Sequence, residues 1–173
     1  LIGGLPAEKV VKEIAQGFGD TMMKIGIVIG LGIMLGKILE ISGAAKSMAV
    51  TFLRLFGKGR EELAMAGTGY MTSIAIFSDS GFIILYEFAK AVSYYTRKSV
   101  VGITYALAIG LTATHNMVPP TPGPLAVAEY FNVDIGIMIF YGMIVALPMM
   151  LAGVLLAGWV GRKVYQVPDE SGR

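Results

Sequence analysis

Apolar residues follow one another along this chain in stretches about as long as a lipid bilayer is thick, and this feature restricts the possible folds most. A spanning helix needs about 20 apolar residues. Residues 22–41 reach that length with their charges near the ends, and residues 135–161 exceed it with no charged residue. Charged residues make up only 15% of the 173 residues, against about 25% in soluble domains. The sequence therefore predicts an all-α integral membrane protein surrounded by lipid, and it excludes a disordered chain and a nucleic-acid-binding protein.

Composition also excludes several kinds of site. The chain has no Cys and one His, so disulfides, thiolate metal sites and sites with several His ligands are impossible. We expect no cofactor. The length suffices for about four to six membrane segments, which is few for a complete transporter, so we expect the chain to be part of a longer one.

Two further segments carry apolar residues on one helical face. Residues 5–20 alternate charged and apolar residues, with Pro6 suited to a first helical turn, and predict a helix lying at the membrane interface. Residues 42–56 predict a second amphipathic helix, with Ser42 as its N-cap and Gly57 as its stop.

Residues 61–95 are too long for one spanning helix. As a continuous helix they would extend about 52 Å, whereas the bilayer core is about 30 Å thick. A cluster of turn-forming residues, 77–81 (FSDSG), interrupts them near the middle. Two short arms joined at a polar tip would enter and leave the bilayer on the same side. The pattern predicts a re-entrant helical hairpin.

Residues 99–131 are interrupted as well. Their apolar run ends at residues 112–116 (TATHN), and four prolines follow within residues 118–124. Proline lacks the amide hydrogen that an interior helical position needs, so the helix cannot continue. A short apolar run resumes after the prolines, and the segment predicts a discontinuous transmembrane helix.

The distribution of Lys and Arg supports the hairpin. If residues 61–95 return to the side from which they enter, the basic residues flanking the membrane segments share one side, and the loop 132–134 on the other side has none. The positive-inside rule then makes the basic side cytoplasmic. The residues concerned are Arg54, Lys58, Arg60, Arg97, Lys98, Arg162 and Lys163.

The two interruptions are expected to meet. Non-helical backbone at membrane depth is tolerated only inside protein or along a wet cavity, and the helices that restart after each break would point their positive N-termini at it. Hydroxyl and amide groups nearby suit a polyhydroxylated acid, and their oxygens would equally suit Na⁺. The candidate residues for binding a small anionic substrate are Ser78, Asp79, Ser80, Gly81, Thr114, His115, Asn116, Thr121, Pro122 and Gly123.

Two of these residues can also carry protons. Asp79 is the one acidic residue predicted deep in the bilayer, where burial would favour its neutral form. It is a candidate proton carrier or hydroxyl-binding acceptor, and the alternative is an N-cap of the returning arm. His115 could donate to an anion or titrate near neutral pH. Its alternative role is a helix C-cap that satisfies freed carbonyls.

Two motifs resemble those of the gluconate permease family of gluconate:proton symporters. Residues 77–85 (FSDSGFIIL) resemble its hairpin motif, and residues 114–124 (THNMVPPTPGP), followed by 126–129 (AVAE), resemble its signature more closely. The resemblance covers nearly the whole chain.

This resemblance implies a fold and an activity. The family belongs to the ion transporter superfamily, whose members have inverted repeats, re-entrant hairpins and, in studied relatives, a dimeric elevator-type architecture. The chain would be one repeat of an inverted-repeat transporter that requires a second repeat half and forms a homodimer. Its substrate would be gluconate or a similar sugar acid, carried with protons across the bacterial cytoplasmic membrane.

Other functions remain compatible with the residues. The same fold could couple a carboxylate or an amino acid to Na⁺, or the chain could be a membrane subunit that does not transport. An intramembrane hydrolase would use Ser78 or Ser80 with His115 and Asp79, but the sequence has no G-x-S-x-G elbow. We therefore predict a transporter and not an enzyme.

Overall fold

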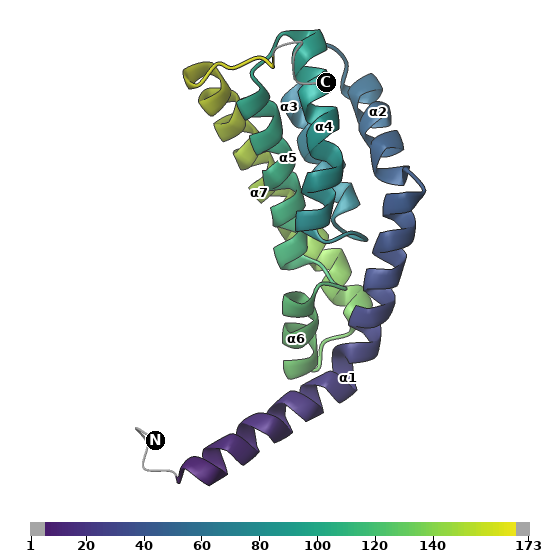
Figure 1. The fold of residues 1–173 in the computed structure, drawn as a ribbon, viewed down its shortest axis with the longest axis vertical. Coiled ribbons are helices and arrows are strands. Elements are labelled where there is room, and N and C mark those ends of the chain that lie inside the picture. The colour runs from purple at the N-terminus through teal and green to yellow at the C-terminus, as the bar shows by residue number, and fades with distance from the viewer. Residues whose placement is uncertain (1–5, 169–173) are drawn as a thin grey trace.

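A computed structural model describes residues 6–168, without the side chains of residues 24, 25 and 40. Within this range all regular secondary structure is helical (Figure 1), as the apolar composition predicts. The helices are α1 (Ala7–Ile41), α2 (Ala44–Phe56), α3 (Glu61–Thr72), α4 (Ser78–Thr96), α5 (Val100–Met117), α6 (Pro122–Tyr130) and α7 (Ile135–Lys163).

Helix α1 replaces two elements that the sequence separates. Residues 7–20 of the predicted interfacial helix and the predicted span 22–41 form one helix, which bends by 54° between Ala7–Met23 and Gly26–Leu39. No proline interrupts α1, and Thr21 Oγ1 donates a hydrogen bond to Gly17 O at 2.8 Å, a contact that often accompanies helix bending. The N-terminal arm therefore projects from the other helices without a break in the chain (Figure 1).

The turn between α1 and α2 corrects the predicted cap. Gly43, not Ser42, occupies the N-cap position of α2, in the left-handed conformation with φ 73°. Ser42 Oγ instead donates to Leu39 O at 3.0 Å, at the end of α1. A connection this short needs a positive φ that glycine adopts without strain. The predicted stop at Gly57 is confirmed, because Gly57 is the C-cap and its N–H bonds Leu53 O.

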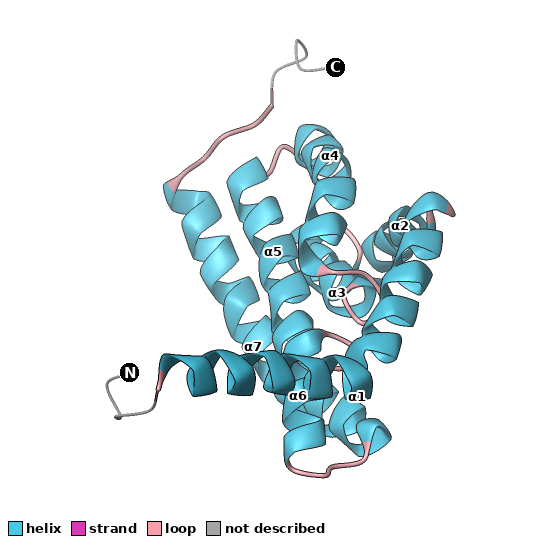
Figure 2. Ribbon diagram, turned by 60° about the horizontal axis from the view of Figure 1, so that its bottom comes forward, coloured by secondary structure: helices cyan, strands magenta, loops and turns pink. Residues whose placement is uncertain are grey.

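Helix α5 is the centre of the helical bundle. Helices α3, α4 and α7 pack around it, with α3 parallel to α5 and α7 antiparallel to it (Figures 1 and 2). Glycines permit these close approaches: a Cβ atom on Gly110 would lie 2.0 Å from Ala66 O of α3, and one on Gly161 would lie 2.9 Å from the Gly102 Cα of α5.

The chain breaks twice inside this bundle. Helix α3 begins at the top of Figure 1 and helix α4 ends there. Residues 73–77 join the two helices at mid-height. Helix α5 descends beside them and stops at residues 118–121, after which α6 continues and α7 returns to the top.

Helix α7 is the one described helix that could cross a membrane by its own length and composition. The two segments of α1 satisfy the same criterion only when they are taken together as a bent pair.

Candidate functional site

The two breaks meet in the middle of the molecule. Residues 73–77 of the first break and Pro120 and Thr121 of the second line one small cavity of about 10 Å³, which α1 closes with Ile29 and Gly32. The rings of Phe77 and His115 also meet edge to face, with centroids 5.7 Å apart. The convergence that the interrupted helices predict is therefore present in the structure.

Helix α1 packs directly against both breaks. A Cβ atom on Gly36 would lie 2.7 Å from Ala75 O, and one on Gly32 would lie 3.3 Å from Pro120 Cγ. These glycines let a third helix cover the place where the two interrupted elements meet.

The first break lies earlier in the chain than the sequence predicts. Residues 78–81 are the first turn of α4 and not a loop, and the irregular backbone is at residues 73–77. The Gly81 N–H donates to Phe77 O at 2.9 Å, which closes the first turn of α4. Serine and aspartate are favourable in a first helical turn as well as in loops, so the turn-forming residues mark a helix start here.

Thr121 holds the second break together. Its Oγ1 lies 2.7 Å from His115 O and 2.8 Å from Val118 O, two carbonyls at the end of α5. Pro122 opens α6 at a position where a missing N–H costs nothing. The alternative role predicted for His115 was to satisfy the free carbonyls at the end of α5, and the Thr121 hydroxyl does this instead. The C-cap residue of α5 is Val118.

Four buried polar atoms beside the breaks have no hydrogen-bond partner among the described residues. Buried polar groups in native proteins are nearly always bonded, and exceptions point to a ligand, an ion or a water. The fifth such atom, Glu61 Oε2, lies 3.0 Å from Lys98 Nζ in an ion pair at the far end of α3. The four atoms at the breaks are Thr72 Oγ1, Ser73 Oγ, Thr114 Oγ1 and His115 Nδ1.

Thr72 and Ser73 were not among the predicted site residues. They end the first arm of the hairpin, where α3 lies parallel to α5. Gly69, one turn before, packs on α5 between Leu107 and Leu111, so Thr72 lies toward the end of α5 that carries Thr114. Two adjacent hydroxyl residues at the end of an apolar arm were the available signal in the sequence.

Comparison with known proteins identifies the family. Residues 1–171 match the GntP family of permeases. The chain belongs to the GntP permease family. Its members are integral proteins of the inner membrane and transport rather than catalyse a reaction.

Three relatives illustrate the similarity of this GntP-family chain to curated proteins. It is 50% identical to an uncharacterized permease of Haemophilus influenzae over 94% of its own length and 33% of the relative's. It is 40% identical to a gluconate permease of Pseudomonas aeruginosa, over 98% of the chain and 38% of the relative, and 34% identical to a high-affinity gluconate transporter of Escherichia coli, over the same shares. The chain thus spans just over a third of these proteins. No solved structure matches it.

Ser78 and Asp79 line a second, open pocket of this GntP-family chain. It has a volume of about 400 Å³ and lies between α4 and α5, with Thr112 on its opposite wall. Asp79 is exposed there, whereas the sequence predicts a buried side chain. Phe77 occupies the N-cap position of α4, so Asp79 is not the cap and lies instead in the first turn.

The remaining predicted residues do not converge on the cavity at the breaks. Gly81 is buried, and a Cβ atom there would lie 2.8 Å from Leu111 Cδ2, so it serves the packing of α4 on α5. Ser80 is half-buried, while Asn116, Pro122 and Gly123 are exposed.

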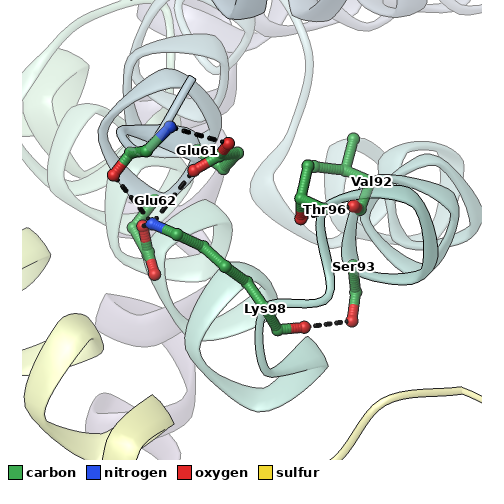
Figure 3. Close-up of polar contacts among 7 residues, drawn as sticks. Glu61, Glu62, Val92, Ser93, Thr96 and Lys98 are labelled. Atoms are coloured by element: carbon green, nitrogen blue, oxygen red, sulfur yellow. Dashed lines mark hydrogen bonds and ion pairs between the residues drawn. The ribbon is translucent and has the colours of Figure 1, made fainter. Parts of the chain in front are cut away.

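A charged cluster fastens the outer ends of the hairpin (Figure 3). Lys98, in the turn after α4, forms ion pairs with Glu61 and Glu62 at the start of α3, and its Nζ donates to Gly59 O at 2.9 Å. Burial by itself would lower the pKa of Lys98, but hydrogen bonds to Glu62 and Glu61 outweigh it and raise that pKa above its usual value. The Gly59 N–H donates to Glu61 Oε1 at 2.9 Å.

Proposed function

We propose that this chain forms one repeat of a secondary transporter that carries gluconate or a similar small sugar acid across the inner membrane. Four buried polar atoms without partners in the residues next to the two breaks carry this proposal, and one of these residues, Ser73, lines the cavity where the breaks meet. The relatives named as gluconate permease and gluconate transporter supply the substrate class.

The arrangement of the helices supports a re-entrant hairpin in the membrane. Helix α3 has 12 residues, or about 18 Å, which is too short to cross a hydrocarbon core of about 30 Å. Arg60 before α3, Arg97 after α4 and Arg162 at the end of α7 line one pocket. The basic ends that the positive-inside rule assigns to the cytoplasm therefore lie together in space.

A sugar acid suits the chemistry of the breaks. The hydroxyls of Thr72, Ser73 and Thr114 can each donate to and accept from substrate hydroxyls. His115 Nδ1 can donate to a carboxylate when it carries a proton. Helices α4 and α6 begin at the breaks, and helix N-termini favour an anion.

Proton coupling assigns the two titratable residues different roles. Asp79, in the open pocket, would exchange protons with solvent, and His115, beside the cavity, would respond to the bound anion. Na⁺ is the second candidate coupling ion, because the cavity of about 10 Å³ is the size of one water or one bare ion and the hydroxyl residues Ser73 and Thr121 belong to its otherwise apolar lining.

We further propose that a second repeat completes the site and that the transporter is a homodimer. The chain covers only 33–38% of the relatives' length, and the cavity at the breaks is too small for a sugar acid in this chain alone. The substrate space would then form between two repeats.

Uptake into liposomes tests the proposal. The protein encoded by the complete gene is reconstituted, and labelled gluconate is supplied under an inward proton gradient, with and without Na⁺. We expect uptake that the proton gradient alone drives and that unlabelled sugar acids compete away. Uptake that requires Na⁺ would select the second candidate ion, and absence of uptake under both gradients would contradict the assignment of substrate.

A further inference from the structure

A pocket of about 480 Å³ lies at the opposite end of the molecule from the arm of α1, at the top of Figure 1. Helix α3 begins there, helices α4 and α5 turn there, and helix α7 ends there. Nothing in the proposed transport mechanism uses it. Its charged and aromatic lining residues are Arg60, Glu62, Arg97, Lys98, Arg162 and Tyr165.

The rim has an excess of positive charge. Lys98 is paired with both Glu61 and Glu62, which leaves one negative charge in that cluster. Three arginines outweigh it, and among the described residues no carboxylate forms an ion pair with Arg60, Arg97 or Arg162. Guanidinium groups bind phosphate oxygens in pairs, with geometry that matches the planar fork of the side chain. The rim therefore suits a phosphate group.

The wall below the rim is apolar. It includes Leu63, Val154 and Gly158, and a Cβ atom on Gly158 would meet nothing within 4 Å, so space remains beside α7. Val154 lies eight residues before Arg162, or about 12 Å along the helix. A free phosphate would leave this wall uncovered, whereas a phospholipid would place its acyl chain along it.

The surrounding residues indicate the level of the pocket in the membrane. Trp159 is 57% exposed and Lys163 Nζ lies 4.7 Å from the centre of its ring. Exposed Trp and Tyr gather at the level of lipid headgroups, and Tyr165 stands at the rim itself. The pocket mouth is therefore at headgroup level, with the apolar wall toward the hydrocarbon.

We propose that this pocket binds an anionic phospholipid, with its phosphate between Arg60, Arg97 and Arg162 and an acyl chain against Val154 and Gly158. Basic pockets between helices on the cytoplasmic side are a recurring form of lipid recognition. The lipid would bridge the start of the hairpin and the end of α7, and it would hold these elements in register.

Lipid binding to the complete protein in phosphatidylcholine nanodiscs tests this proposal. Phosphatidylglycerol is added, and retained lipid is measured by native mass spectrometry and thermal unfolding. The double variant R60Q/R162Q removes two rim charges, and K46Q/R54Q removes two charges from α2, outside the pocket. We expect R60Q/R162Q to weaken phosphatidylglycerol retention by about tenfold or more and K46Q/R54Q to leave it unchanged.

A second variant separates lipid from free phosphate. Gly158→Leu fills the space along the apolar wall and keeps every arginine. We expect it to weaken binding of long-chain phosphatidylglycerol more than binding of a dihexanoyl analogue, and glycerol phosphate at the same concentration to compete poorly. Equal retention in R60Q/R162Q and K46Q/R54Q, equal stabilisation by phosphatidylcholine, or full competition by glycerol phosphate would each overturn the proposal.

Discussion

At the scale of single residues, the hydroxyl of Thr114 is a group whose removal should affect transport and stability differently. It is fully buried and has no partner among the described residues, so it weakens the folded state unless something binds it. In contrast, the hydroxyl of Thr68, equally buried, donates to Ala64 O at 2.8 Å.

Thr114→Val should therefore abolish or strongly reduce gluconate uptake without loss of stability. Removal of an unsatisfied buried hydroxyl is expected to leave the free energy of unfolding unchanged or to raise it by about 1 kcal/mol. Uptake into proteoliposomes and thermal unfolding in detergent measure the two effects. Thr68→Val is the matched control and should transport normally; equal uptake by both variants would remove Thr114 from the site.

Asp79 supports a second residue-scale prediction. It is exposed in the first turn of α4 and does not cap it, so Asp79→Asn should change the stability by less than about 1 kcal/mol, the size of a helix-dipole effect. If Asp79 carries the proton, the variant loses uptake driven by a pH gradient. A large fall in the melting temperature of the purified variant would instead indicate a structural role.

At the scale of elements, the charged cluster of Lys98, Glu61 and Glu62 joins the start of α3 to the turn after α4. Glu61 is 5% exposed, and Lys98 joins it to the turn that follows α4 (Figure 3). The two ends of a hairpin that are far apart in sequence are thereby fixed side by side.

Lys98→Met should destabilise the fold by roughly 2–3 kcal/mol, because it leaves a buried carboxylate without its partner. The pKa of Lys98 is raised in the folded state. The stabilisation that its charge gives to the fold is therefore complete below the unfolded pKa of about 10.4, and it is lost as the pH rises through the folded pKa.

Melting temperatures measured from pH 7 upward check this prediction. The difference between wild type and Lys98→Met should narrow above about pH 10.4. Lys90→Met is the control, since Lys90 pairs with the 69% exposed Glu87 on the surface of α4 and should contribute less than about 1 kcal/mol. Equal losses in both variants would contradict a special role for the cluster.

The elements also show where local patterns mislead. Residues 78–81 predict a loop by composition, yet they form the first turn of α4, because the same residue types favour loops and helix starts. Ser42 has the residue type of an N-cap, but the two-residue turn between α1 and α2 needs the positive φ of Gly43 at that place.

At the scale of the whole molecule, the positions of the two breaks and of the basic helix ends fit the same path of the chain through the molecule. Helices α3 and α4 have their outer ends together, and the loop 131–134 lies at the far end, before α7 (Figure 2). If α3 and α4 form the re-entrant hairpin that we propose, residues before and after it are reachable from the same side of the membrane.

Single cysteines introduced into a background without other cysteines test this topology. Lys58→Cys before the hairpin and Tyr95→Cys at its end should both react with a membrane-impermeant maleimide only from the cytoplasmic side. Val133→Cys should react only from the opposite side. Labelling of Lys58→Cys and Tyr95→Cys from different sides would show that the segment crosses the membrane and would refute the hairpin.

The helical membrane class, the two interruptions and the family could be read from the sequence, because apolar run length, proline content and motif order are local properties of the chain. Only the packed helices show which side chains lack partners, that Thr72 and Ser73 are among them beside Thr114 and His115, and that Asp79 lines a different pocket from the cavity at the breaks. These outcomes depend on which helix packs against which, and glycines distant in sequence set the helix separations. Whether a buried polar atom is satisfied is a property of its neighbours in space.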